Sequence, residues 1–406
     1  MSERGMVIIG AGMAGARAVI GLRANGWDGS ITLIGEETLF PYDRPPLSKA
    51  MLVDEQEPSP VLLLDEGMLA SLKATVIRGN RANAIDRVRR LIRLDDGATV
   101  EYEKLLLATG AKPRHLTIPG GELAYTLRNY ADGDHLRERL RHSESAAIVG
   151  GGFIGLEVAA SARKLGCRVA LIEAQSRILM RGVPEDIAAM VHARHVASGV
   201  EMYIGTALQA VETDGVRLAD GRKIKADIVI AGIGAAPDTA LADQAGLAID
   251  NGIACDGQLR TSDEHIFAAG DCCSFPHPLF GNRRIRLEAW RNAQDQGTLA
   301  AGNMLGAGKT YAAVPWFWSD QYDLSLQIAG MPGDGREAVR RQISADAFMI
   351  FHRDGAGRLV GVSGIGPGNS ISRDVKLAEM LIAKGISPSA EALGNSDIGL
   401  KTLLKG

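Results

Sequence analysis

The sequence predicts an α/β protein with two similar nucleotide-binding units and a small α+β unit at its end. Two glycine-rich runs, about 140 residues apart, carry this prediction: Val7-Ile-Ile-Gly10-Ala-Gly12-Met-Ala-Gly15 and Ala147-Ile-Val-Gly150-Gly-Gly152-Phe-Ile-Gly155. Each run follows an apolar strand-like segment and opens a helix-like segment, which is how a βαβ unit begins. The last ninety or so residues, from about 314, hold no third copy and read as short strands followed by a helix.

Both glycine-rich runs have the spacing of a dinucleotide-binding turn. The glycines permit a tight turn and a close approach of the backbone to pyrophosphate, and the helix N-terminus favours its negative charge. An acid suited to a ribose diol follows each run: Glu36 lies 21 residues after Gly15, and Glu173 lies 18 residues after Gly155. Two such turns predict two Rossmann-like domains and two dinucleotides, an arrangement that suits electron transfer from a nicotinamide to a flavin.

Glu173 bears on which nicotinamide dinucleotide the second turn accepts. A carboxylate binds a free 2′-hydroxyl and repels a 2′-phosphate, so NADH is favoured over NADPH. Arg177 follows four residues later and weakens this preference, because an arginine can be recruited to a phosphate.

The first unit is expected to contain a loop without regular structure at residues 40–49, because three prolines fall in it. Its short strands after residue 75 are expected to form an antiparallel excursion, with a turn at Asp96-Gly97. In order, the expected elements are a strand at 6–9, a helix at 13–25, strands at 30–34, 76–77, 82–86 and 91–94, and a buried strand at 102–110 that ends in a glycine turn.

The second half of the sequence first repeats this order of strands and helices and then continues with a different set of short elements. Its expected elements are a strand at 147–149, a helix at 153–165, a strand at 169–172, a helix at 185–198, short strands near 200–230, a closing strand at 227–234, a helix at 288–304, alternating segments at 325–328, 347–351 and 359–362, and a helix at 372–384.

Composition narrows the class of protein. The chain has 406 residues, a net charge of −3 and 46% hydrophobic residues, so nothing in its overall charge argues for nucleic acid. No apolar run approaches the roughly 20 residues that a membrane helix needs. The first strand is reached by Val7, which leaves no room for a signal peptide, so a cytoplasmic location is expected. The four cysteines form no CxxC pair and the eight histidines show no metal-ligand spacing, so no metal is expected.

Seven segments, in order between residues 7 and 322, resemble the FAD-dependent NADH:ferredoxin reductases of bacterial oxygenase systems. That group resembles glutathione reductase in fold but lacks its redox disulfide. Two of the segments, the Pro-Pro-Leu-Ser-Lys49 loop and the Trp316-Phe-Trp-Ser-Asp-Gln-Tyr322 run, are specific to this group. The others are the two glycine runs, the second continuing into Leu156-Glu157, and Leu107-Ala-Thr-Gly110, Ala269-Gly270-Asp271 and Leu287-Glu288-Ala-Trp290-Arg-Asn-Ala-Gln.

The resemblance implies which residues bind FAD. Glu36 would bind its adenosine ribose, Asp271 its ribityl chain, and Trp290 would lie beside its isoalloxazine ring. Arg44 and Lys49 would line the flavin side of the site, and Ala82 would contact the adenine end through its backbone. The full set implied for FAD is Gly10, Gly12, Met13, Ala14, Gly15, Glu36, Arg44, Lys49, Ala82, Ala108, Thr109, Gly110, Arg128, Gly270, Asp271, Glu288, Ala289 and Trp290.

The resemblance also implies the NADH site and the reacting pair. Lys49 and Glu157 would pair beside the flavin, where a cation stabilises the negative charge of the reduced ring and a carboxylate holds that cation in place. No general base is then needed. The set implied for NADH is Gly150, Gly152, Phe153, Ile154, Gly155, Glu157, Glu173 and Gly234.

Domains and partners follow from the same resemblance. Residues 1–109 and 234–313 are expected to form the FAD-binding domain, 110–233 the NADH-binding domain, and 314–406 a C-terminal α+β domain. The electron acceptor would be an acidic two-iron ferredoxin that supplies an oxygenase, and the protein would be a monomer. Four arginines near Trp290 are candidates for docking that acidic partner, although such a cluster is more often a solvated face: Arg283, Arg284, Arg286 and Arg291.

Other functions remain open. The oxygenase could be an aromatic-ring-hydroxylating dioxygenase or a haem-thiolate monooxygenase. The sequence Pro41-Tyr-Asp-Arg-Pro-Pro favours the dioxygenase. An NADH oxidase or peroxidase would need a redox cysteine after the first helix, and residues 36–50 contain none. An NADH sensor related to apoptosis-inducing factor would want extended basic surface and a targeting segment, which the net charge of −3 and the early first strand disfavour.

Overall fold

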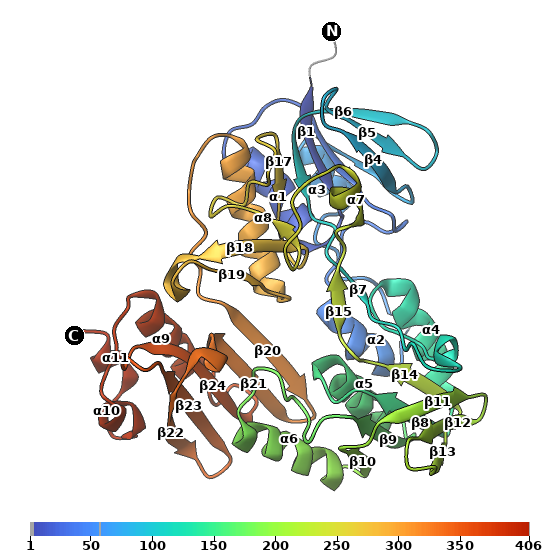
Figure 1. The fold of residues 1–406 in the computed structure, drawn as a ribbon, viewed down its shortest axis with the longest axis vertical. Helices are drawn as coiled ribbons and strands as arrows, with labels where there is room; N and C mark the ends of the chain where they lie inside the picture. The colour runs from blue at the N-terminus through green and yellow to red at the C-terminus, as the bar shows by residue number, and fades with distance from the viewer. Residues whose placement is uncertain (1–3, 57, 406) are drawn as a thin grey trace. The chain divides into compact units, whose positions relative to one another are not determined.

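The computed structural model describes residues 4–56 and 58–405, and it divides the chain into two units (Figure 1). Unit 1 contains residues 1–43, 59–112 and 236–313. Unit 2 contains residues 44–58, 113–235 and 314–406. The chain passes between the units five times, and two of these passages lie within β7 (Ala111–Pro113) and β15 (Ala235–Pro237). The three functional domains expected from the sequence stay a prediction.

Unit 1 is built on a sheet in the order β3-β2-β1-β6-β5-β4, with β17 also paired to β6. Strand β6 (Thr99–Leu107) belongs to two kinds of pairing. From Tyr102 onward it pairs parallel with β1, and from Leu105 also with β17, whereas its first residues lie antiparallel to β5. The remaining elements of the sheet and its connections are β1 (Gly5–Ile9), α1 (Met13–Ala24), β2 (Ile31–Ile34), α3 (Glu66–Ser71), β3 (Ala74–Ile77), β4 (Ala82–Asp86), β5 (Leu91–Leu94) and β17 (Ile266–Ala268).

The late part of unit 1 returns to the first helix. Helix α8 (Trp290–Met304) packs on α1 with little space between the backbones, because a Cβ on Gly297 would lie 2.2 Å from the Ala14 carbonyl oxygen. This contact places the N-terminal part of α8 against the glycine-rich turn. The other late elements are α7 (Ala240–Gln244), β16 (Ile253–Ala254), β18 (Cys273–His277), η3 (Pro278–Phe280) and β19 (Arg283–Arg286).

Unit 2 repeats the parallel sheet, in the order β10-β9-β8-β14, and adds a three-stranded antiparallel sheet. Buried Arg137 on α4 holds the segment that follows Lys49, since its guanidinium donates to the carbonyls of Met51 and Asp54. The elements are η1 (Pro45–Ser48), α2 (Ala50–Val53), η2 (Gly121–Leu123), α4 (Tyr130–Arg141), β8 (Ser145–Val149), α5 (Phe153–Lys164), β9 (Arg168–Glu173), α6 (Glu185–Ala197), β10 (Val200–Ile204), β11 (Leu208–Glu212), β12 (Gly215–Leu218), β13 (Lys223–Lys225) and β14 (Ile228–Ala231).

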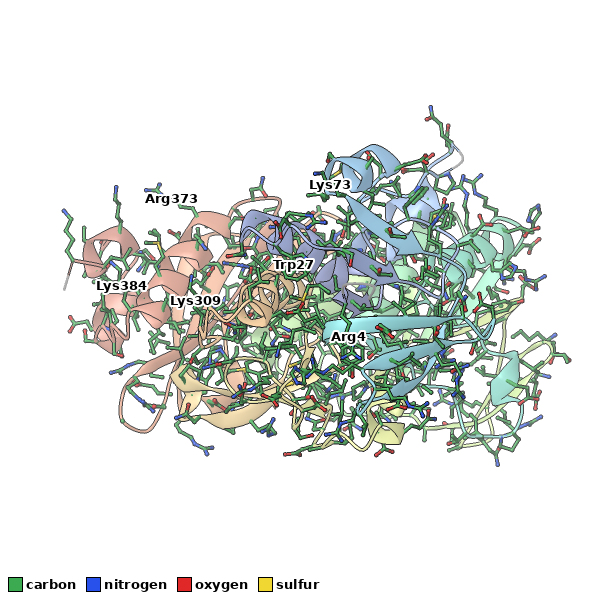
Figure 2. All side chains as sticks on the ribbon, turned by 90° about the horizontal axis from the view of Figure 1, so that it is seen from above. Arg4, Trp27, Lys73, Lys309, Arg373 and Lys384 are labelled. Carbon is green, nitrogen blue, oxygen red and sulfur yellow. The ribbon has the colours of Figure 1, made fainter. Side chains whose placement is uncertain are left out.

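The C-terminal part of unit 2 is an antiparallel sheet in the order β20-β21-β24-β23-β22, with α9 packed on β21 and β24. Its apolar residues share one core with α5, α6 and the parallel sheet. Arg373 in the first turn of α9 and Lys384, its C-cap residue, are both exposed and are labelled in Figure 2. The elements are β20 (Trp316–Gln321), β21 (Leu324–Gly330), η4 (Pro332–Asp334), β22 (Glu337–Ser344), β23 (Ala347–Arg353), β24 (Leu359–Pro367), α9 (Ser372–Ala383), α10 (Ala390–Gly394) and α11 (Leu400–Leu403).

The predicted fold class is confirmed, and the α/β pattern occurs twice. Two local predictions are wrong. Val76–Ile77 does not belong to the antiparallel excursion, because β3 pairs parallel with β2. The proline loop contains regular structure, since Pro45–Ser48 forms a 3₁₀ turn; a proline at the start of such a turn has the required φ and loses no hydrogen bond there. No described helix combines the length and the apolar character needed to span a bilayer.

Two buried histidines in unit 2 make its stability depend on pH. Burial lowers the pKa of His195 and of His352 from 6.5 to about 4. Below about pH 6.5 the unfolded chain therefore takes up protons that the folded chain does not bind until the pH approaches 4. Each histidine contributes stability above its unfolded pKa, and this contribution is lost as the pH falls through the window between the two values.

Lowering the pH from 8 to 5 is expected to reduce the free energy of unfolding by about 2 kcal/mol for each of these histidines. Denaturant unfolding followed by circular dichroism measures this change. His195→Gln and His352→Gln should each remove part of the pH dependence, whereas His142→Gln, at an exposed site, should not. A double variant with the wild-type pH dependence would contradict the assignment.

Candidate functional site

The first glycine-rich turn, in unit 1, requires glycine at its first and last positions, Gly10 and Gly15. Gly10 has φ +111°, and a Cβ there would lie 2.1 Å from the carbonyl oxygen of Ala108, at the end of β6. A Cβ on Gly15 would lie 2.0 Å from the carbonyl oxygen of Gly10. The turn is thus closed by backbone against backbone, and the segment Leu107–Gly110 is part of the cradle because Ala108 packs against it.

The start of α1 is open to an anion. Gly12 is its N-cap residue, with no side-chain cap, and the first turn contains no acid. The amides of Met13, Ala14 and Gly15 therefore have no acceptor within the helix and carry the partial positive charge of its N-terminus. A pyrophosphate fits such a place, so the residues present suit the FAD that the resemblance implies.

The other FAD candidates of unit 1 lie on neighbouring elements. Glu36, two residues after β2, has a side chain that is 63% exposed and lies 3.8 Å from Arg81. Ala82 begins β4 and is buried. The Thr109 hydroxyl donates to the carbonyl of Asp238 at 2.6 Å, and the Gly110 carbonyl accepts from the Asp238 amide.

The N-terminus of α8 completes the set in unit 1. Gly270 has φ +81°, and its amide donates to the side-chain oxygen of buried Gln296 at 2.8 Å, which fixes the turn before Asp271. Glu288 accepts from Arg286 at 2.5 Å, and Ala289 is the N-cap residue of the helix. The Trp290 indole donates to Asp43 at 2.5 Å, which ties the first residue of α8 to the proline loop.

The second turn, in unit 2, has the geometry of the first. Gly150 has φ +108°, and a Cβ there would lie 2.5 Å from the carbonyl oxygen of Gly232. A Cβ on Gly155 would lie 2.1 Å from the carbonyl oxygen of Gly150. Helix α5 also begins without a side-chain cap or an acid in its first turn, which contains Phe153 and Ile154 after the N-cap residue Gly152. The same anion-binding cradle is therefore present in both units.

Glu173 lies directly on this second cradle. One oxygen of its carboxylate accepts from the amide of Gly151 at 2.7 Å, and the other accepts from the amide of Gln175 at 2.7 Å. Arg177 instead donates to the backbone carbonyls of Ile178, Leu179 and Val183. The arginine is thus committed to its own loop, and the carboxylate keeps the site suited to a free ribose and to NADH. Gly234, with φ +105°, accepts through its carbonyl from the amide of Arg114.

Lys49 and Glu157 form an ion pair in unit 2, with a distance of 2.7 Å between Nζ and Oε2. The Glu157 side chain is only 4% exposed, whereas that of Lys49 is 30% exposed. The Ser48 hydroxyl donates to the same carboxylate oxygen at 2.5 Å, and the Ser319 hydroxyl donates to the other at 2.6 Å. A buried carboxylate that accepts from three donors is held in one orientation.

Not every predicted residue falls in the unit of its expected partners. Arg44 and Arg128 belong to unit 2, where the Arg44 guanidinium donates to the Arg128 carbonyl at 2.6 Å. In the arginine cluster of unit 1, Arg284 donates to the carbonyls of Cys255 and Ser274, and Arg286 is bound to Glu288. The part of the cluster around β19 therefore serves in part to hold its own strands together.

Sequence reasoning missed the hydroxyls of Ser48 and Ser319. Both lie inside motifs that carry the resemblance, next to Lys49 and within the Trp316–Tyr322 run. Only their position inside these motifs could have indicated a role for the two serines, because a serine in a loop or strand is normally a surface residue. The contact between them through Glu157 joins residues 271 positions apart.

Comparisons with known proteins agree with this geometry. The family model described as pyridine nucleotide-disulphide oxidoreductase matches residues 4–297, and the model described as reductase C-terminal matches residues 316–404. The anthranilate 1,2-dioxygenase system ferredoxin–NAD(+) reductase component of Burkholderia cepacia is 41% identical over 411 residues, covering 100% of both chains. Putidaredoxin reductase of Pseudomonas putida is 34% identical over 98% of this chain and 96% of its own.

A solved structure is similar along the whole chain. The covalent putidaredoxin reductase–putidaredoxin complex contains a chain that is 32% identical and superposes with a TM-score of 0.93, covering 100% of this chain and 99% of that one. These matches include both glycine-rich turns and the C-terminal sheet, so FAD and NADH are the two dinucleotides implied for the cradles.

Replacing the last glycine of each run is expected to affect the binding of one dinucleotide and not of the other. Gly155→Ala should raise the dissociation constant of NADH about tenfold or more while FAD stays bound, because the new Cβ would collide with the Gly150 carbonyl. Gly15→Ala should instead lose FAD. Visible absorbance of the purified protein gives the FAD content, and titration with NADH gives the affinity.

Gly302→Ala is the control for this pair. Gly302 is a buried glycine in α8 whose added Cβ would meet nothing closer than 3.7 Å, so both cofactors should bind as in the wild type. Loss of FAD from Gly155→Ala, or normal NADH binding by it, would show that the cradles are not assigned as described.

Proposed function

The chain belongs to the pyridine nucleotide-disulphide oxidoreductase family, and we propose that it is an FAD-containing NADH:ferredoxin reductase. It takes electrons from NADH and passes them to a two-iron ferredoxin, which supplies an oxygenase. The observation that carries this proposal is the repeated cradle: one turn closed by glycine backbone in each unit, with φ +111° at Gly10 and +108° at Gly150. Two cradles bind two dinucleotides, and the reaction brings these together.

FAD is assigned to the first cradle and NADH to the second. The amides at the start of α1 would bind the FAD pyrophosphate, Glu36 its ribose, and the turn at Gly270-Asp271 its ribityl chain. When bound, FAD accepts two electrons together and releases them one at a time, which is the change that a ferredoxin requires. The chain itself binds, orients and supplies charge, and no residue needs to act as a general base.

The electrons leave through a protein partner. The chain has no cysteine between residues 36 and 50, where a redox disulfide or a peroxidase cysteine would lie, and all four cysteines are free and buried. The relatives named for ferredoxin reductase support a ferredoxin as the acceptor.

An aromatic-ring-hydroxylating dioxygenase is the favoured terminal oxygenase. The dioxygenase reductase of Burkholderia cepacia is 41% identical, whereas putidaredoxin reductase is 34% identical, so breakdown of aromatic compounds is the favoured setting. A ferredoxin that supplies a haem-thiolate monooxygenase is the second candidate. We place the reaction in the cytoplasm, where NADH is available, and assign it to a monomer as the resemblance implies.

Reduction of cytochrome c by NADH, measured with and without an added two-iron ferredoxin, tests the function. Reduction that depends on ferredoxin is expected. Consumption of hydrogen peroxide without ferredoxin would support an NADH peroxidase instead, and NADH binding with no turnover of either acceptor would support a sensor. Pairing the reductase with ferredoxins from dioxygenase and from haem-thiolate systems separates the two oxygenase candidates.

Lys49→Met is expected to leave FAD bound and to slow its reduction by NADH about 100-fold, because the cation that stabilises the reduced ring is lost. Stopped-flow absorbance gives the rate of this step. Lys376→Met is the control, since it removes an exposed lysine on α9 that lies 3.1 Å from the buried carboxylate of Glu379, and it should not change the rate. A wild-type rate in Lys49→Met would remove this role from Lys49.

Arg283→Glu is expected to raise the apparent KM for ferredoxin roughly fivefold and to flatten its dependence on salt, because an acidic partner loses an attractive charge. Arg283 is exposed at the start of β19, whereas Arg284 is left unchanged because it bonds to strand carbonyls. Arg373→Glu makes the same charge change at an exposed position of α9 and should not change the KM for ferredoxin. Unchanged ferredoxin kinetics in Arg283→Glu would exclude this residue from docking.

A further inference from the structure

A continuous series of buried hydrogen bonds in unit 2 ends at the carboxylate of Glu157. His195 Nε2 lies 2.8 Å from the side-chain oxygen of Gln321, and the Gln321 amide nitrogen lies 3.1 Å from the hydroxyl of Ser319. Ser319 in turn donates to Glu157 at 2.6 Å. These four side chains are at most 4% exposed, although they come from α6, β20 and α5.

The donors in this series all run in one direction. The Gln321 nitrogen donates to Ser319, so the oxygen of the same amide faces His195 and can only accept. His195 Nε2 must therefore carry the proton, and the Ser319 hydroxyl, which already accepts from Gln321, is left to donate to Glu157. The negative charge of the carboxylate thus lies at the end of an aligned row of dipoles.

The series cannot serve as a proton path. An amide does not readily take up and release protons as imidazole, hydroxyl or water does, and Gln321 stands in the middle of the row. This series of hydrogen bonds can instead fix the position of the Glu157 carboxylate. Ser319 holds one oxygen of Glu157, while Ser48 and Lys49 hold the other at 2.5 Å and 2.7 Å.

We propose that Ser319, supported by Gln321 and His195, is a positioning residue that orients Glu157 and, through it, fixes the place of the Lys49 ammonium group. This inference rests on the proposed function, in which the Lys49 cation acts on the flavin. Ser48 performs the same task from the other side, and its own carbonyl is held by the hydroxyl of Ser161 at 2.7 Å.

Apart from Lys49, the charged and titratable groups near this series of hydrogen bonds do not orient Glu157, so the serine hydroxyls have this role. His195 is neutral in the working pH range, because burial lowers its pKa to about 4. Tyr322, whose hydroxyl lies 3.4 Å from His195 Nδ1, has its pKa raised by burial and also stays neutral. Arg194 is bound to Asp323 at 2.6 Å. Lys49 is the cation that faces the carboxylate directly.

The test compares flavin properties of Ser319→Ala with those of Ser319→Thr, which keeps the hydroxyl. Ser319→Ala is expected to shift the midpoint potential of bound FAD to more negative values and to slow FAD reduction by NADH about tenfold. The dissociation constant of NADH should not change, because the hydroxyl is assigned to the carboxylate and not to the nucleotide. Ser319→Thr should restore both values to within about twofold. Dye-coupled reductive titration gives the potential without using NADH.

Three further variants separate positioning from loss of stability. Ser48→Ala should act like Ser319→Ala, since it removes a donor from the same carboxylate, and it serves if Ser319 variants do not fold. Gln321→Leu should lower the melting temperature most, because it leaves the buried Nε2 of His195 without a partner, but change the potential less than Ser319→Ala does. Ser363→Ala is the control: it removes a buried hydroxyl that lies 3.2 Å from His352, and it should change neither potential nor rate.

The results distinguish this inference from the function it rests on. Normal potential and rate in Ser319→Ala and Ser48→Ala, or equal changes in Ser363→Ala, would overturn it. If Lys49→Met changes the potential and Ser319→Ala does not, the role of Lys49 stands and the positioning role falls. If both change the potential but ferredoxin is not reduced, the positioning role stands and the proposed partner is wrong.

Discussion

The contact on which the rest of the structure depends is the approach of one backbone to another inside each glycine-rich turn. A Cβ on Gly15 or on Gly155 would lie 2.0 or 2.1 Å from the carbonyl oxygen of the turn's first glycine. That closeness brings the start of the helix over the end of the strand and leaves the helix amides open. The later elements are arranged around this point, as the approach of Gly297 to the Ala14 carbonyl illustrates.

Local patterns were sufficient to predict both copies of this arrangement. The order of apolar strand, glycine turn and helix reports chain geometry directly, because glycine is needed where φ is positive or where backbones touch. The sequence does not predict that Val76–Ile77 pairs parallel with β2. Its partner lies more than forty residues earlier, and a short apolar run does not indicate whether a strand pairs parallel or antiparallel. The three prolines predict a loop and not the 3₁₀ turn at Pro45–Ser48, because proline breaks longer helices and strands but fits the start of such a turn.

The site was predictable to the extent that its residues lie in motifs. The resemblance supplied Lys49 and Glu157, and the structure brings them to 2.7 Å. It did not supply the reason why a carboxylate that is 4% exposed is tolerated there. That reason is the pair of serine hydroxyls at positions 48 and 319, and a contact between segments so distant in the chain is settled only by folding. Burial of a charge without such donors is unfavourable.

Arg177 gives the second cradle a consequence for coenzyme engineering. Three backbone carbonyls of its own loop occupy its guanidinium. With NADH bound as proposed, replacing Glu173 would therefore end the repulsion of a 2′-phosphate without providing a cation to attract one. The replacement would also free the amides of Gly151 and Gln175, which the carboxylate now binds. A variant that prefers NADPH needs a newly introduced basic side chain and a new partner for these amides, so the preference for NADH is protected against single substitutions.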